Sequence, residues 1–223
     1  LIHAGAENEV KVVVNSIHSE YLDKENISKN LRQLDGIIVA PGFGQRGLDG
    51  KILAVEYARV NKIPFLGICL GMQMAVIEYA RNVKKIRYAN STEISEKCKD
   101  PVIDLMTSQK EIINKGGTMR LGAWDCEIEK NTKSYKSYKK KLISERHRHR
   151  YEFNNSYSDR IFDDKFIVAG SNPDTKLVEI VENIDHPWFV GVQFHPEYKS
   201  SVYNPHPIFV NFVKASLKNY LKK

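Results

Sequence analysis

The sequence contains little cysteine and no long apolar run. Its 223 residues include three cysteines, Cys69, Cys98 and Cys126, with no CxxC pair. An odd, scattered count excludes a disulfide framework and a structural zinc site, so we expect no metal and a reducing compartment. The apolar runs are too short to span a membrane, and the opening LIHAGAENEV lacks the regions of a signal peptide. We therefore expect a cytoplasmic protein without a membrane partner.

The charge pattern also lacks the marks of a nucleic-acid-binding protein. The formal net charge is +7, but the lysines are widely spread. The densest run, at 139 to 141, has one neighbouring tyrosine and no set of aromatic residues on which bases would stack. We therefore expect no nucleic-acid partner and interpret the basic excess as a solvated surface.

The first half alternates short β-rich runs with amphipathic stretches. KVVV at 11–14, GIIVA at 36–40 and IPFLGI at 63–68 are typical of strands. Helical spacing of apolar residues predicts helices over 48–59 and 70–81. Strand, helix and strand in this order indicate a parallel sheet.

The second half contains strand-like segments separated by turn residues, which favours an antiparallel extension. These segments are LISERHRHRYEF at 142–153, FIVAG at 166–170, KLVEIVE at 176–182 and WFVGVQF at 188–194. Residues 128–141 are polar and predict a mobile surface loop or lid, and a closing helix starts near Pro207. The expected fold is one α/β domain, with a mainly parallel central sheet flanked by helices and a small antiparallel extension.

The segment GICLGMQ at 67–73 places Cys69 between a predicted strand and a predicted helix. Glycines at 67 and 71 relieve crowding at a sharp turn, and the spacing G-x-C-x-G matches the G-x-S-x-G turn of hydrolases. At a helix N-terminus we expect the thiolate to form more easily than at the free pKa of about 8.5. Cys69 is therefore a candidate nucleophile, and the alternative is a small buried core residue.

A thiol nucleophile needs a base, and His195 is the best candidate. It follows the strand WFVGVQF in the segment VQFHPE, with Glu197 two residues later on the same side of an extended chain. Glu197 is predicted to orient the imidazole in a Cys-His-Glu triad. The alternative is a strand-end histidine near a surface glutamate. His147 and His149 alternate with arginines and suggest one charged strand face.

Acyl transfer also needs donors for an oxyanion. The N–H of Leu70, just after the cysteine, is one candidate. Gly42, in the segment APGFG at 40–44, is the other, because Pro41 has no N–H. An ordinary turn at a strand end is the alternative, and the segment lacks the Gly-Lys-Ser/Thr ending of a P-loop.

Together these motifs resemble the class I (triad) glutamine amidotransferases, which have a flavodoxin-like fold. The finer resemblance is to the glutaminase domain of the CTP synthase family. It is carried by PGFGQRGLDGKI at 41–52, PFLGICLGMQMAVIEYARNV at 64–83, NSTE at 90–93, MRLG at 119–122, ERHRHRYEFN at 145–154 and HPWFVGVQFHPE at 186–197.

The resemblance implies that Cys69 attacks the side-chain amide of L-glutamine, and that His195 moves protons under the influence of Glu197. A γ-glutamyl thioester would form and water would release glutamate. Glu93 would pair with the substrate ammonium and Arg150 with its carboxylate, although the sequence alone leaves both open as surface charges. The implied glutamine site also contains Gly42, Leu70, Gly71, Met72 and Gln73.

The resemblance also implies partners outside these residues. No cofactor is expected in this domain; ATP and Mg²⁺ would bind an amino-terminal synthetase domain that converts UTP to CTP and is absent from residues 1–223. GTP is a possible allosteric activator, acting through a lid around 117–122, and the full-length enzyme is expected to be a homotetramer.

Two departures from the family pattern raise further expectations. The family commonly has PGGFG where this chain has APGFG, which questions the backbone path at Pro41. The start, LIHAG, looks like a helix end closed by Gly5, so we expect the domain to lack its first strand. Two alternative functions remain open: a related triad hydrolase, such as a γ-glutamyl hydrolase or a cysteine peptidase, and a catalytically silent regulatory module.

Overall fold

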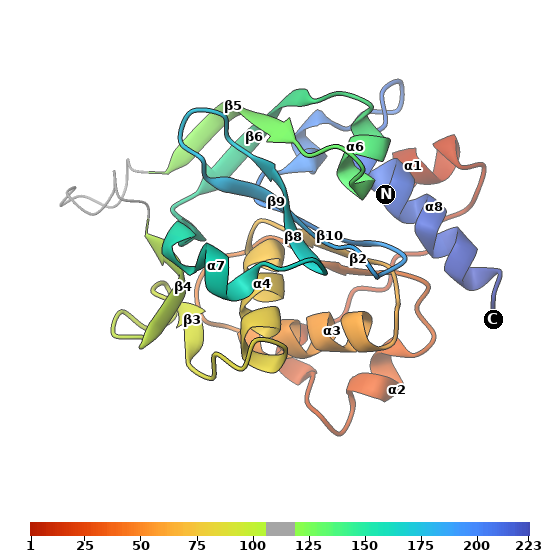
Figure 1. The fold of residues 1–223 in the computed structure, drawn as a ribbon. Coiled ribbons are helices and arrows are strands. Elements are labelled where there is room, and N and C mark those ends of the chain that lie inside the picture. Colours follow the sequence, from red (N-terminus) through yellow and green to blue (C-terminus); the bar gives the residue numbers. More distant parts are fainter. Residues whose placement is uncertain (106–118) are drawn as a thin grey trace.

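The computed structural model describes residues 1–105 and 119–223. Their strands form a central sheet with helices on both faces and a smaller sheet at one end (Figure 1). The proposed lid at 117–122 falls only partly within these residues. Gly117 lies outside them, and residues 120–122 begin strand β5.

The helices and strands follow the chain in the order labelled in Figure 1. The helices are α1 (Ile2–Glu7), α2 (Ile27–Leu31), α3 (Leu48–Val60), α4 (Leu70–Asn82), α6 (Lys133–Tyr138), α7 (Ser158–Ile161) and α8 (Pro207–Tyr220), with short 3-10 turns η1 (Ser19–Tyr21), η3 (Asn155–Tyr157) and η4 (Pro196–Lys199). The strands are β1 (Ile37–Val39), β2 (Phe65–Ile68), β3 (Ala89–Ser91), β4 (Asp100–Leu105), β5 (Arg120–Ile128), β6 (Leu142–His149), β7 (Tyr151–Phe153), β8 (Phe166–Ser171), β9 (Val178–Asn183) and β10 (Phe189–Val192).

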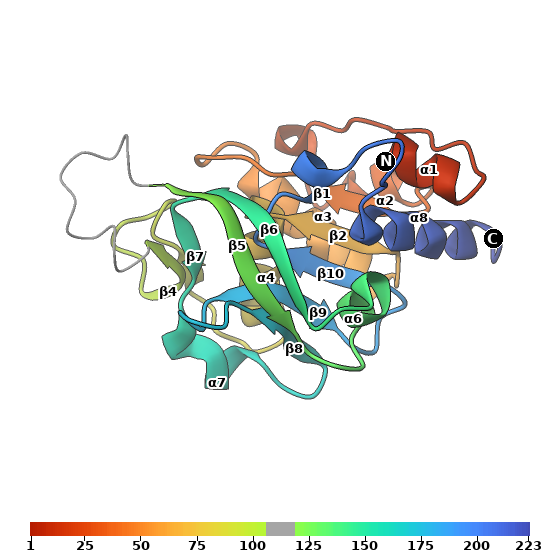
Figure 2. The same cartoon turned by 90° about the horizontal axis from the view of Figure 1, so that it is seen from above.

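The larger sheet has the strand order β1-β2-β10-β9-β8-β5-β6. Strands β1, β2 and β10 run parallel, and the sheet continues with antiparallel pairs from β10 to β6. Figure 2 shows the long β5–β6 ribbon curving away from the parallel strands. The smaller sheet has the order β3-β4-β7. The expected α/β fold, with parallel strands and an antiparallel extension, is confirmed.

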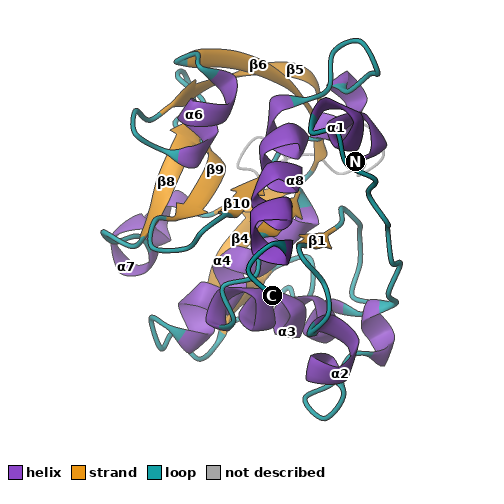
Figure 3. Cartoon of the chain, turned by 90° about the vertical axis from the view of Figure 1, so that its right-hand side faces the viewer, coloured by secondary structure: helices purple, strands orange, loops and turns teal. Residues whose placement is uncertain are grey.

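Neighbouring residues on the parallel strands face two different cores. On β2, Phe65 is fully buried in the core formed with α3 and α4, whereas Leu66 is fully buried in the core beneath α8 and α1. This alternation follows from the two-residue period of a strand. Because both faces are covered, the strands are apolar throughout and carry no polar face (Figure 3).

The predicted helices over 48–59 and 70–81 are confirmed as α3 and α4. An ion pair joins them: Arg59 donates from Nε and Nη2 to the carboxylate of Glu78, at 2.8 and 2.6 Å. Glu78 is fully buried, so removing its guanidinium partner would leave a buried carboxylate uncompensated. The closing helix is confirmed as α8, where Pro207 occupies the first turn and the side chain of His206 accepts a hydrogen bond from the N–H of Ile208.

The prediction of a strand at 11–14 was wrong. These residues have no regular structure, and Val13 and Val14 are 71% and 58% exposed. A β-rich run becomes a strand only beside a partner, and no strand of the described residues pairs with it. The expected helix end at Gly5 was also wrong. Helix α1 continues to Glu7, and Gly5 lets the following chain cross the helix, since a Cβ there would lie 2.8 Å from the carbonyl oxygen of Val10.

The prediction that 128–141 form a loop missed helix α6. The side chain of Thr132 caps this helix by accepting from the N–H of Tyr135. The N–H groups of Lys133 and Ser134 donate to the carboxylate of Glu182 at 2.8 and 2.7 Å. The polar composition therefore reflects a capped helix anchored on a buried glutamate of β9.

Candidate active site

The turn between β2 and α4 holds Cys69 in an unusual backbone conformation. Its φ is +53° and its ψ is −104°, a region that costs energy for any residue with a side chain. The flanking glycines make the turn possible. A Cβ on Gly67 would lie 2.6 Å from the carbonyl of Gly71, and a Cβ on Gly71 would lie 2.0 Å from the carbonyl oxygen of Val39. The predicted strand-to-helix turn is therefore present, and both glycines are sterically required.

The expectation of an easily formed thiolate was wrong for this state of the molecule. Cys69 is only 3% exposed, and burial raises its pKa to about 12. The backbone hydrogen bond from Leu70 and the charge of Lys51 act in the opposite direction, while Glu93 and Glu197 raise the pKa further. Loss of hydration outweighs the helix N-terminus. The resting sulfur is therefore a thiol.

His195 and Glu197 follow β10, the strand next to β2. The two strands pair with Ile68 opposite Val192, and the N–H of Cys69 donates to the carbonyl of Val192 at 2.7 Å. This register places the cysteine and the histidine at the same edge of the sheet.

The imidazole of His195 is held by the carboxylate of Glu197. Nδ1 of His195 lies 2.7 Å from Oε1 of Glu197, and the ring of Tyr198 stacks on the imidazole with centroids 5.3 Å apart. Nε2 is buried and has no hydrogen-bond partner among the described residues. Because Nδ1 is committed to the carboxylate, Nε2 is the nitrogen available for proton transfer.

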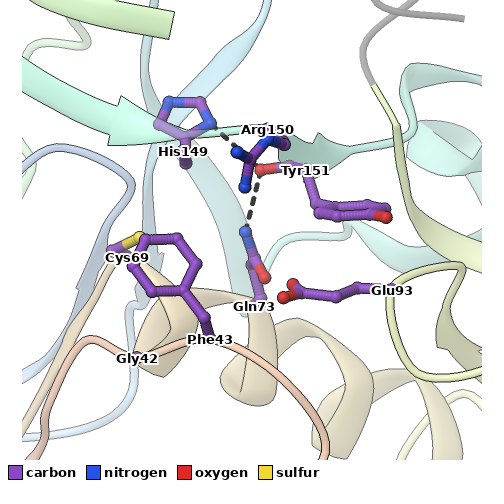
Figure 4. Close-up of a pocket in the computed structure, with 8 residues that line it drawn as sticks. All are labelled: Gly42, Phe43, Cys69, Gln73, Glu93, His149, Arg150 and Tyr151. Atoms are coloured by element: carbon purple, nitrogen blue, oxygen red, sulfur yellow. Dashed lines mark hydrogen bonds between the residues drawn. The ribbon is translucent and has the colours of Figure 1, made fainter. Parts of the chain in front are cut away.

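A small pocket lies beside Cys69 (Figure 4). Five of the predicted site residues line it, together with residues that the sequence did not indicate. The lining residues are Gly42, Phe43, Cys69, Gln73, Glu93, His149, Arg150 and Tyr151. Of the other predicted residues, His195 and Glu197 follow β10, and Leu70, Gly71 and Met72 form the first turn of α4, where Gly71 packs on β1.

Glu93 ties the loop after β1 to the smaller sheet. Its Oε1 accepts a hydrogen bond from the N–H of Gly44 at 3.0 Å, and its own N–H donates to Oγ of Ser91 at 3.1 Å. Gln45 adds a second link by donating to the carbonyl of Ile94 at 2.7 Å. The loop that carries Gly42 is therefore held against the pocket despite the proline at position 41.

Arg150 lies where the strand-like run 142–153 divides between the two sheets. Strand β6 ends at His149 and belongs to the larger sheet, whereas β7 begins at Tyr151 and belongs to the smaller one. The break turns Arg150 into the pocket wall, opposite in charge to Glu93. One pocket thus contains a thiol, a carboxylate and a guanidinium.

Three residues that the sequence did not indicate lie in or beside the site. Lys51 of α3 places Nζ 3.2 Å from the position of a Cβ on Gly42, and burial lowers the pKa of this amine. Gln193 donates from Nε2 to the sulfur of Cys69 at 3.7 Å. His149, expected on a charged strand face, is buried, whereas Arg146 and Arg148 are exposed. The strict alternation in RHRHR was the available signal for a buried histidine face.

Two classes of feature are absent from the part of the chain that the structure describes. Within it, no group of three or more His, Cys, Asp or Glu side chains is placed to hold a metal ion. None of its helices is both long enough and apolar enough to cross a bilayer.

Comparisons with known proteins agree with this geometry. Residues 1–215 match the family model described as glutamine amidotransferase class-I. The chain is 60% identical over 221 residues to a CTP synthase of Flavobacterium johnsoniae and 59% identical over 222 residues to one of Christiangramia forsetii. The two alignments include 99% and 100% of the present chain, respectively, but only 41% of the length of each CTP synthase.

Among solved structures, the chain resembles the Trypanosoma brucei CTPS glutaminase domain with bound acivicin. The TM-score is 0.91 and the identity 38%, with 97% of this chain and 85% of that one covered. A Thermotoga maritima glutamine amidotransferase shares the fold. Its TM-score is 0.51 and its identity 13%, with 94% of this chain and 96% of that one covered.

Proposed function

Because the chain belongs to the class I glutamine amidotransferase family, we propose that it is the glutaminase domain of a CTP synthase. It would hydrolyse L-glutamine and supply ammonia for the ATP-dependent amination of UTP. The similarity to two CTP synthases over nearly the whole chain supports this proposal. So does the similarity to a glutaminase domain whose bound acivicin is a glutamine analogue.

One observation carries the proposal: a strained cysteine turn and a histidine–glutamate pair lie at one sheet edge beside a pocket of mixed charge. The sulfur of Cys69 would attack the side-chain amide carbon of glutamine while Nε2 of His195 accepts the thiol proton. His195 would return that proton to the leaving nitrogen, releasing ammonia and a γ-glutamyl thioester. Water, deprotonated by the same imidazole, would then release glutamate and the free thiol.

The developing oxyanion requires donors. We assign the N–H groups of Leu70 and Gly42 to this role, since Leu70 already hydrogen-bonds the sulfur and Gly42 lines the pocket. The loop around Gly42 is fixed by the hydrogen bond from Gly44 to Glu93. The donors would therefore be in place before the substrate arrives.

The pocket charges suit a free amino acid. Glu93 would pair with the ammonium group of glutamine and Arg150 with its carboxylate. Gln73 would contact the substrate from the floor of the pocket, next to the backbone of Gly71 and Met72. This opposite pair of charges distinguishes the proposal from a γ-glutamyl hydrolase or a cysteine peptidase, whose substrates extend beyond one amino acid.

Substrate binding would also activate the nucleophile. Glu93 raises the pKa of Cys69 in the empty site, and a bound ammonium would neutralise that charge. The thiol would therefore ionise more readily when glutamine is present, which limits reaction with other electrophiles.

The wider setting of this domain follows from similarity alone. An amino-terminal synthetase domain would bind ATP, Mg²⁺ and UTP, and GTP would act as an activator. We expect a homotetrameric enzyme in the cytoplasm, with no cofactor in the present domain. The relatives are more than twice as long as this chain, which leaves room for the synthetase domain.

Glutamate release from glutamine tests the proposal. We would compare the wild-type chain with Cys69→Ala, each with and without GTP and a supplied synthetase domain. The expected result is turnover in wild type and none in the variant. Turnover that survives in Cys69→Ala would exclude the proposed nucleophile. If a glutamine-mimicking electrophile fails to label Cys69 at all, the chain is instead a silent regulatory module.

A further inference from the structure

Gln193 is fully buried next to the candidate nucleophile. It follows β10 directly, and its N–H donates to the carbonyl of Glu179 on β9 at 2.8 Å. Its side chain bridges two partners. Nε2 of Gln193 lies 3.7 Å from the sulfur of Cys69, and Oε1 of Gln193 lies 3.3 Å from Nε2 of Gln73. The buried amide of Gln193 is therefore placed to donate a hydrogen bond to the sulfur of Cys69.

We propose that Gln193 is a further catalytic residue, whose amide N–H stabilises the Cys69 thiolate and whose orientation is fixed by a buried hydrogen bond from Gln73. The inference rests on the proposed glutaminase function, because it assigns a role in the ionisation of the same cysteine.

The orientation of the Gln193 amide follows from its neighbours. Nε2 of Gln73 donates to the carbonyl of Tyr151 at 2.9 Å, and it also donates to Oε1 of Gln193 (Figure 4 shows the first of these bonds). Since Gln73 presents a donor, Gln193 must present its oxygen to Gln73 and its N–H to the sulfur. A flipped amide would instead direct an oxygen at a developing thiolate.

The chain continues through two histidines, and each bond fixes the next. Nδ1 of His149 lies 3.0 Å from the carbonyl of Tyr151, which only accepts, so this nitrogen carries the proton. Nε2 of His149 is then an acceptor and receives a hydrogen bond from Nδ1 of His147 at 3.0 Å. Burial holds both imidazoles neutral by lowering their pKa values to about 2 for His147 and about 3 for His149.

The hydrogen-bond chain ends at His147. Its Nε2 lies 3.7 Å from Oε2 of Glu179, whose Oε1 pairs with Nη1 of Arg120 at 2.7 Å. These side chains are nearly inaccessible, and Nε2 of His147 has no hydrogen-bond partner among the described residues. The amide of Gln193 is therefore held by the nearer bonds, from Gln73 to its oxygen and from Gln73 to the Tyr151 carbonyl.

The sulfur has need of such a donor. Burial, and to a smaller extent the carboxylates of Glu93 and Glu197, raise its pKa, whereas the Leu70 backbone bond and the charge of Lys51 lower it. A hydrogen bond to a charged group contributes enough free energy to shift a pKa by about one unit or more. The geometry therefore points to Gln193 as the side-chain donor that makes ionisation attainable.

The test is the rate at which iodoacetamide alkylates Cys69 at pH 8, followed by mass spectrometry of the Cys69 peptide. This rate tracks the thiolate fraction and needs no glutamine turnover. Gln193→Met keeps the length but removes the donor, and we expect a rate about tenfold lower. Gln193→Glu is nearly isosteric and should be at least as slow, because a carboxylate oxygen would face the sulfur. In glutamine hydrolysis, both variants should lower kcat and leave KM unchanged.

A matched control separates this role from a loss of stability. Asn172 lies in the turn between β8 and β9, and its buried side-chain amide donates to the carbonyl of Asp125 on β5 at 2.8 Å. Asn172→Ala removes this amide. It should lower the melting temperature and leave the alkylation rate at the wild-type value. An unchanged rate in Gln193→Met overturns the inference, and so does an equal fall in Asn172→Ala.

The chain of bonds has its own test. Gln73→Met removes the donor to Oε1 of Gln193 and should slow alkylation in the wild-type background, with no further fall in Gln193→Met. Additive effects would refute coupling through the chain. Failure of the proposed function looks different: glutamate release would then persist in Cys69→Ala, whatever the alkylation rates are.

Discussion

Replacing Gly71 with alanine tests the link between the fold and the nucleophile. A Cβ at this position would lie 2.0 Å from the carbonyl oxygen of Val39 and 3.0 Å from its carbonyl carbon. Ordinary contact begins at 3.4 Å, so the first turn of α4 must move by more than 1 Å away from β1. The nearest atoms that it meets belong to the backbone of β1, which cannot rotate away as a side chain does.

The magnitudes follow from this displacement. Overpacking of a buried site typically costs about 1–3 kcal/mol, and backbone contact places Gly71→Ala near the upper end. In a chain of this size, each kcal/mol lowers the melting temperature by about 2–4 °C, so we expect a loss of about 6–12 °C. A shift of about 1 Å at the nucleophile lowers catalysis by about 100-fold. Calorimetry and glutamate release per folded molecule measure the two effects.

Gly36→Ala is the control. Its Cβ would also overlap neighbours, lying 2.2 Å from Oγ of Ser216 and 2.7 Å from Cζ of Phe212 on α8, but these are side-chain atoms away from the pocket. It should reduce stability and leave kcat near the wild-type value. A Gly71→Ala protein that melts and turns over like wild type would refute the steric account of the turn.

Three further predictions concern the His195–Glu197 pair, the Arg59–Glu78 pair and Glu152, a buried residue of β7. Glu197→Gln keeps a group of the same shape beside the imidazole, where Oε1 lies 2.7 Å from Nδ1 of His195, but it removes the charge. The value of kcat should fall at least about tenfold with little change in KM. An unchanged kcat would contradict the assigned role. Glu152→Gln removes a carboxyl group whose pKa is raised to about 8 by burial. The stability that this group contributes in wild type is present below pH 4.5 and declines as the pH rises through 8. Relative to wild type, the variant should therefore be more stable in denaturant unfolding at pH 9 but not at pH 4. Arg59→Met removes the cation that pairs with the buried carboxylate of Glu78. It should lower the unfolding free energy by about 3–5 kcal/mol, while the kcat of the folded protein stays the same. If Arg59→Met lowers the unfolding free energy less than Glu78→Gln does, this explanation is wrong.

The parts of the site that lie in short contiguous motifs were predictable from the sequence. Glycines two residues from Cys69 on each side indicated the turn, and His195 and Glu197 shared one motif at a strand end. Parallel strands end at the same edge of a sheet, so their convergence followed from the order of the elements. Glu93 and Arg150 needed the family resemblance, because a single charged residue carries no spacing of its own.

The remaining features depend on partners that are distant along the chain. The pKa of Cys69 moved in the direction opposite to expectation because burial depends on the whole fold, whereas the helix N-terminus is visible locally. Gln193 stands two residues from His195, yet its role depends on Gln73, 120 positions away. The run at 11–14 has strand-like residues, but a strand also needs a neighbour, which no local pattern supplies.

Detection of an acyl intermediate on Cys69 would establish this residue as the nucleophile. We would mix the chain with glutamine, quench it in acid within milliseconds, and locate the added γ-glutamyl group by peptide mass spectrometry. We expect a thioester on Cys69 that disappears in Cys69→Ala. Glutamate formation with no adduct on any cysteine, or with an adduct on Cys98 or Cys126 alone, would contradict it.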